Sequence, residues 1–268
     1  MKGLNYMTSF GALTNALTRR KIQVINHLLV LDIIAILLTI LYAVYQGDLS
    51  AADPLIYTMS YSLVVFFVAF ILIARHNERI FVNDSYRLVP TSDTGLYSAN
   101  LLSAFISMIY LGVTQIIFSM IAAAMNFQQV MTTLGQAFEH SSPTPGSMNS
   151  RSEIIGALIG LVILMIVSTI FAWASISLIH LTTSALTAFL PDSRSRLYRF
   201  ILYVVVIAAI LYILGKIVNP IGDIFYGMVN DNSYYQIYLS SLALLVVAGL
   251  ESAVNVYLLR NWVETTNW

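Results

Sequence analysis

Long apolar runs alternate with short polar segments along the whole chain, and this pattern predicts six membrane-spanning helices. A helix needs about 20 mostly apolar residues to cross the hydrocarbon core of a bilayer. We expect spans at about 21–46, 55–74, 101–125, once within 154–191, 200–218 and 234–259. The predicted fold class is therefore an all-α integral membrane protein, with a single transmembrane domain over residues 1–268.

The first 20 residues precede these spans and predict an amphipathic helix. Apolar residues recur three or four positions apart, which places them on one helical face: Tyr6, Phe10, Leu13 and Leu17. A basic run follows at 19–21. One apolar face and a basic end are typical of a helix that lies flat on the membrane surface, and the alternative is a frayed polar tail.

The fourth apolar run is too long for one crossing and too short for two. Residues 154–191 contain no Asp, Glu, Lys or Arg. As one helix this run would be about 57 Å long, against a hydrocarbon core of about 30 Å. We expect a single crossing, with a surplus at 177–190 that projects or lies along the inner surface.

Composition supports a membrane protein and excludes several other classes. The chain is 58% hydrophobic and only 10% charged, whereas soluble domains carry about 25% charged residues. Its net charge is zero and it has no basic block, so nucleic acid is not an expected partner. It has no cysteine, no G-x-x-x-x-G-K-[ST] loop and no H-E-x-x-H motif, and its four histidines are scattered. We expect no catalytic residue, no metal site and no cofactor in this chain.

The distribution of positive charge predicts the orientation. Cytoplasmic loops of membrane proteins are enriched in Lys and Arg. With both ends inside, only Arg151 and Lys216 fall outside. The other basic residues lie on the inner side: Lys2, Arg19, Arg20, Lys21, Arg75, Arg79, Arg87, Arg194, Arg196, Arg199 and Arg260. We expect a multi-pass protein of the plasma (cytoplasmic) membrane, with an outer loop at 126–152 and a cytoplasmic loop at 191–199.

The polar segment at 75–100 joins the second and third spans and carries the most distinctive motif. It holds the sequence Asn-Asp-Ser-Tyr-Arg-Leu-Val-Pro-Thr-Ser at 83–92, followed by Leu-Tyr-Ser-Ala-Asn-Leu-Leu at 96–102. Pro90 disfavours a helix through the preceding residue, and Thr91 or Ser92 can cap a new helix with Asp93 in its first turn. We expect a short helix between the two spans, on the cytoplasmic side.

This motif and the six-span layout resemble the membrane permeases of the type-2 ABC exporter class. In that class an R-x-L-P-[IV]-S-like sequence precedes the third span, and the order here differs by one residue. The resemblance implies a pair of permease subunits, identical or related, each resting on a separate ATPase that binds ATP and Mg. It also implies that the loop is the ATPase-coupling element, with these residues as candidates: Tyr86, Arg87, Leu88, Pro90, Thr91 and Asp93. The alternative is an ordinary cytoplasmic connector.

Two carboxyl groups fall near the middle of the membrane. Asp32 lies about 16 Å along the first span, and Glu251 lies about 13 Å from the inner end of the sixth. Asn255 is one turn from Glu251 on the same face. A charge at this depth costs at least about 2.5 kcal/mol, so these side chains should face protein or a wet cavity. They line a translocation path, hold a proton or cation, or join helices by hydrogen bonds.

Small residues in the fourth span allow a close helix contact. Gly156 and Gly160 form a G-x-x-x-G pattern, which permits two helices to approach closely, although such a pattern also arises by chance.

The sequence favours the membrane subunit of an ABC exporter, which moves an amphipathic or hydrophobic peptide, lipid or drug outward. Two other classes stay open. One is a non-transporting immunity or scaffold protein, which would tolerate changes near Pro90. The other is an ion-coupled carrier, which would depend on Asp32 or Glu251.

Overall fold

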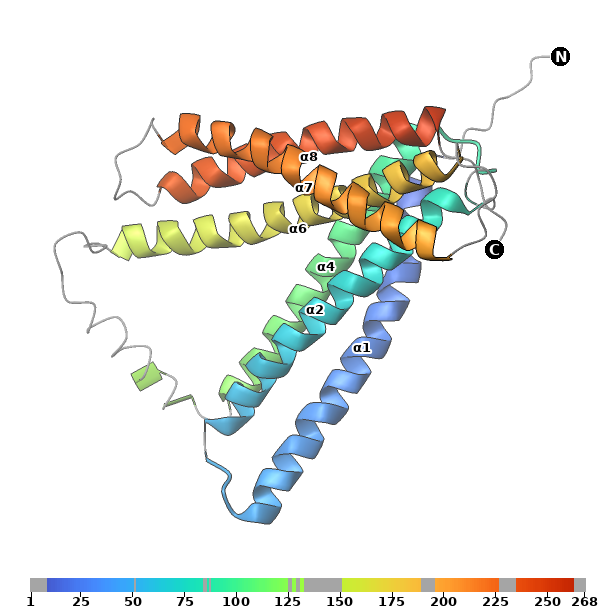
Figure 1. Ribbon diagram of the computed structural model, residues 1–268. Helices are drawn as coiled ribbons and strands as arrows, with labels where there is room; N and C mark the ends of the chain where they lie inside the picture. The colour runs from blue at the N-terminus through green and yellow to red at the C-terminus, as the bar shows by residue number, and fades with distance from the viewer. Residues whose placement is uncertain are drawn as a thin grey trace. The chain divides into compact units, whose positions relative to one another are not determined.

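The computed structural model describes residues 9–50, 52–83, 86, 88–124, 127–128, 131–132, 151–188, 196–226 and 235–262, with the side chains at 151–154, 188, 196–199 and 217–226 outside the description. Over this part of the chain all regular structure is helical (Figure 1). The six helices are α1 (Phe10–Gln46), α2 (Asp53–Val82), α4 (Asp93–Ala124), α6 (Arg151–Ala188), α7 (Arg196–Tyr226) and α8 (Tyr235–Asn261). The predicted all-α class is confirmed.

Five of these helices, all except α7, are long and apolar enough to cross a membrane. The described side chains of α7 include a shorter apolar helical stretch, Phe200–Lys216. Large apolar side chains also stand exposed along single helices, for example Leu31, Leu37 and Leu41 on α1. Exposed apolar surface of this extent is rare on soluble monomers. The chain is therefore a multi-pass membrane protein.

Helix α1 differs from the expected surface helix followed by a span. It begins at Phe10, where the hydroxyl of Ser9 accepts a hydrogen bond from Ala12 N–H, and it ends at Gly47, whose φ of 77° suits a residue without a side chain. It runs without a break through Arg20 and Lys21. The structure does not confirm a separate surface helix at 1–20.

Other helix ends also differ from the expected spans. Helix α7 continues through Pro220 to Tyr226, beyond the expected end of the fifth span at about residue 218. Helix α6 is continuous over 38 residues, and residues after Ser177, such as Leu181 and Thr183, are buried. One face of this surplus therefore packs inside the C-terminal unit, and its position relative to the membrane surface stays a prediction. Most of the expected loops at 126–152 and 191–199 fall outside the described residues.

The chain forms two compact units, which divide within α2 between Asn77 and Glu78 and within α4 between Tyr97 and Ser98. We call the unit that contains α1, α2 up to Asn77 and α4 from Ser98 the N-terminal unit. The C-terminal unit contains Glu78–Tyr97 together with α6, α7 and α8, which pack against one another (Figure 1). The single transmembrane domain expected from the sequence stays a prediction.

Candidate functional site

The segment around Pro90 is an exposed tip between two helices. Helix α2 continues to Val82 and α4 begins at Asp93, so the connection between these two helices is much shorter than the predicted polar segment. Leu88 is 82% exposed, Pro90 is exposed, and Tyr86, Thr91 and Asp93 are half-buried. Arg87 lies outside the described residues, as do Asp84 and Ser85, so the expected short helix stays a prediction.

Ser92 provides the predicted helix cap. Its hydroxyl accepts a hydrogen bond from Gly95 N–H at 3.1 Å, and its carbonyl accepts from Leu96 N–H at 2.9 Å. Asp93 then lies in the first turn of α4, where the helix dipole favours a negative charge. A serine directly before the helix supplies the acceptor that the first N–H groups lack. The start of α4 is thus fixed by local sequence.

The base of this tip is held by an aromatic pair. Phe81 in the last turn of α2 and Tyr97 in the first turns of α4 are both buried, with ring centroids 5.5 Å apart and planes 18° apart. Stacked rings of this kind stabilise a contact by about 0.5–1.5 kcal/mol beyond the area that they bury. The pair therefore holds together the end of α2 and the start of α4, the two helices that the connection joins.

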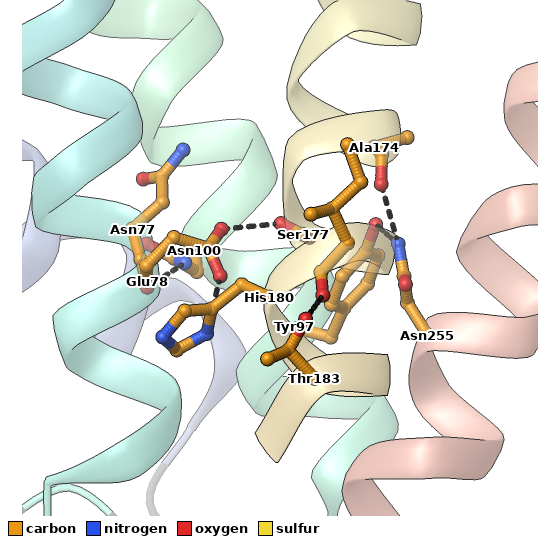
Figure 2. Close-up of polar contacts among 10 residues, drawn as sticks. Asn77, Glu78, Tyr97, Asn100, Ala174, Ser177, His180, Thr183 and Asn255 are labelled. Carbon is orange, nitrogen blue, oxygen red and sulfur yellow. Dashed lines mark hydrogen bonds and ion pairs between the residues drawn. The ribbon is translucent and has the colours of Figure 1, made fainter. Parts of the chain in front are cut away.

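Polar side chains connect the same base to α6 and α8 in the C-terminal unit. Glu78 accepts a hydrogen bond from the Ser177 hydroxyl at 2.6 Å and lies 3.0 Å from the Nδ1 atom of His180 (Figure 2). The side-chain amide of Asn255 donates to the hydroxyl of Tyr97 at 3.1 Å, and Tyr97 donates to Ser252 at 3.4 Å. Each end of the connection is therefore bonded to a different long helix.

Glu251 and Asn255 enter the interface between α6 and α8 together. Ser175 donates to Glu251 Oε1 at 2.9 Å, and the Asn255 amide also donates to the carbonyl of Ala174 at 2.9 Å (Figure 2 shows the Asn255 contacts). The Ala174 carbonyl can only accept, so it fixes which end of the Asn255 side chain is the NH₂ group. Glu251 Oε2 and Asn255 Oδ1 are buried and have no hydrogen-bond partner.

Asp32 lies in the N-terminal unit and has a separate set of partners. Gln115 on α4 donates to Asp32 Oδ2 at 2.7 Å, and Ser62 on α2 donates to Gln115 Oε1 at 2.7 Å. Asp32 is 2% exposed, and its Oδ1 atom has no hydrogen-bond partner. Asp32 and Glu251 thus belong to different compact units, and each is held within its own.

Sequence reasoning counted Lys21 only as a basic residue at a helix end, but it is one of the most buried side chains. Its Nζ atom donates to the Asn100 carbonyl at 2.7 Å, to Asn100 Oδ1 at 2.8 Å and to Ser103 at 2.6 Å. Three acceptors satisfy all three N–H donors of a lysine. The Asn100 amide in turn donates to the Asn77 carbonyl at 3.2 Å (Figure 2), so α1, α2 and α4 are joined at this level.

The partners that sequence reasoning missed are mostly single polar residues in apolar helices: Lys21, Glu78, Gln115, Ser175, Ser177 and His180. Such residues usually face protein because lipid offers no hydrogen bonds. Their presence was visible in the sequence, but their pairing was not. The roles expected of the candidate coupling residues and of the candidate path residues Asp32, Glu251 and Asn255 stay predictions.

Comparisons with protein families, with curated proteins and with solved structures find no match for this chain.

Proposed function

We propose that the chain is the membrane subunit of an ATP-driven exporter of the type-2 ABC class. It moves an amphipathic or hydrophobic substrate, such as a peptide, lipid or drug, outward across the plasma membrane. ATP and Mg are bound by a separate ATPase subunit, and a second permease subunit, identical or related, completes the transporter. Both chain ends and the Pro90 tip face the cytoplasm in this proposal.

The observation that carries the proposal is an exposed apolar tip on a firmly held base. Leu88 is 82% exposed, although the aromatic pair Phe81 and Tyr97 directly beneath the tip is almost completely buried. A leucine in water gains free energy when it enters an apolar groove, about 1.5–3 kcal/mol for full burial. Such a tip suits a docking contact with a soluble subunit.

The hydrogen bonds at the base give a route for mechanical coupling. A displacement of the tip would act on α6 through Glu78, which bonds to Ser177, and on α8 through Tyr97, which bonds to Asn255 and Ser252. The movement would therefore reach the C-terminal helices. Side chains near mid-membrane, Asp32 and Glu251 among them, remain candidates for the translocation path.

The test is to change the tip without disturbing the fold. Leu88→Asp places a charge on a side chain that is already exposed, so the chain should insert and fold normally. Leu49→Asp is the matched control, because Leu49 is also exposed but lies in the connection between α1 and α2. We expect Leu88→Asp to lose co-purification of the ATPase subunit and at least tenfold of the substrate-stimulated ATP hydrolysis, while the control retains both.

The proposal fails if no ATPase subunit co-purifies from the native membrane with the unaltered chain. It also fails if Leu88→Asp and Pro90→Ala leave coupled ATP hydrolysis unchanged.

A further inference from the structure

The interface between α6 and α8 contains two buried oxygen atoms that nothing in the described part of the chain satisfies. Glu251 Oε2 and Asn255 Oδ1 have no hydrogen-bond partner, and their side chains are 3% and 0% exposed. Almost all buried polar groups in proteins are paired with protein, water or an ion. An unpaired buried acceptor costs about 1–3 kcal/mol, and more when it is charged. Two of them together indicate a missing positively charged or donating group.

Both atoms belong to one site. Glu251 and Asn255 are one helical turn apart on the same face of α8. Their other polar atoms bond to Ser175 and Ala174, which are adjacent residues of α6. The two side chains therefore enter the same interface at the same level. The groups that bond to the other ends of the two side chains are the Ser175 hydroxyl, the Ala174 carbonyl and the Tyr97 hydroxyl, and all three are neutral.

The charge of the site selects a singly charged ion. Glu251 supplies one negative charge, and a buried charge needs a partner of opposite sign. No group of three or more His, Cys, Asp or Glu gathers within the described part of the chain, so the dense carboxylate set typical of a protein calcium site is not present there. Carboxylate and carbonyl oxygen atoms are ligands that hard cations prefer.

We propose that the α6–α8 interface binds one alkali-metal cation, with the Glu251 carboxylate and the Asn255 side-chain carbonyl as its anchoring ligands. The ion is Na⁺ or K⁺, and its binding neutralises the carboxylate and satisfies both unpaired oxygen atoms. Because the Asn255 amide also bonds to Tyr97, the site is one hydrogen bond from the base of the Pro90 tip. The site does not depend on the exporter proposal, since it is built entirely from residues of this chain.

The test measures ion binding to the full-length chain alone, so it requires no ATPase subunit. The purified protein in nanodiscs of a zwitterionic lipid is titrated with ²²Na⁺ by scintillation proximity, at constant pH and ionic strength. We expect one saturable site, displaced by unlabelled NaCl or KCl but not by choline chloride. The salt that displaces the label at the lower concentration identifies the preferred ion.

Variants separate this site from other binding. Glu251→Gln removes the charge but can still accept from Ser175, and we expect it to weaken binding at least tenfold. Asn255→Leu leaves the carboxylate in place and should weaken binding several-fold, which keeps the test valid if the first variant fails to fold. Asp48→Asn is the control, because Asp48 is an exposed carboxyl in the connection between α1 and α2, outside the proposed site, and it should bind normally.

Three results would overturn the proposal. The first is the absence of saturable ²²Na⁺ binding above the choline control. The second is unchanged affinity in both Glu251→Gln and Asn255→Leu. The third is an infrared band of a protonated carboxyl that is lost in Glu251→Gln and is unchanged by Na⁺ or K⁺ in the unaltered chain. Such a band would show that Glu251 holds a proton and not a metal ion. If the unaltered chain binds the ion but no ATPase subunit co-purifies with it, the result would count against the exporter proposal only.

Discussion

Each of the two buried membrane carboxyl groups is held through one oxygen atom. Asp32 receives its hydrogen bond from Gln115, and Glu251 receives its bond from Ser175. In an apolar interior these donors replace the hydrogen bonds that water would supply, and a carboxyl group that loses its donor bears the full cost of desolvation. The donors are therefore as important to folding as the carboxyl groups themselves.

Removal of Gln115 and Asp32 together should cost less stability than the two single removals added together. Gln115→Leu leaves Asp32 with no protein donor, and we expect a loss of about 1–3 kcal/mol in the free energy of unfolding. The double variant Asp32→Leu/Gln115→Leu replaces both polar groups by apolar ones, so it should cost clearly less than the sum of the two single changes. Unfolding in detergent, followed by tryptophan fluorescence, measures the four proteins. Additive effects would show that the 2.7 Å contact between the two side chains contributes no stability.

Among the helices, α6 and α8 make the closest described contact through a glycine. A Cβ atom built on Gly160 would lie 3.1 Å from Ile237 Cγ2 and 3.4 Å from Tyr238 Cε2. Tyr238 also donates a hydrogen bond to the Gly156 carbonyl at 2.6 Å. The G-x-x-x-G pattern of α6 therefore has a packing role against the first turns of α8.

A larger side chain at Gly160 should push the two helices apart. We expect Gly160→Leu to cost about 1–3 kcal/mol in the free energy of unfolding, because the interface has no space for it. The control is Gly249→Leu on α8, where a Cβ atom meets nothing within 4 Å. The control should be neutral or stabilising, since leucine favours a helix more than glycine does. Thermal unfolding midpoints of both variants provide the comparison, and equal midpoints would contradict a packing role for Gly160.

The helices and their caps could be predicted from the sequence, and their partners could not. Apolar runs and the serine at position 92 are local signals, and they predicted the long apolar helices and the start of α4. The sequence suggested a change from a surface helix to the first span at about residue 21, because a basic residue after an amphipathic run is typical of a surface helix. In the structure α1 has no break there, and Lys21 packs against Asn100 and Ser103. The pairing of Asp32 with Gln115 depends on how each helix is rotated, and single-helix periodicity does not contain that information.

At the scale of the whole molecule, the uneven distribution of basic residues is the strongest determinant of orientation. Of the 13 Lys and Arg residues, 11 fall on one side of the predicted spans and two on the other. Positive charge in short loops resists transfer across the membrane during insertion, so we expect the basic side to stay in the cytoplasm. This prediction puts the Pro90 tip on the cytoplasmic side, and that position is a condition of the proposed ATPase contact.

The absence of cysteine from the sequence makes this orientation directly measurable, because any introduced cysteine is the only thiol. Leu49→Cys and Leu88→Cys place that thiol at exposed positions in the two connections that flank α2. In intact cells a membrane-impermeant maleimide should label Leu49→Cys alone, and in inverted vesicles it should label Leu88→Cys alone. The reverse result would put the Pro90 tip outside the cell, where no ATP-hydrolysing subunit can reach it. Cation binding between α6 and α8 would be unaffected by that outcome, because all its ligands lie within one compact unit of the chain.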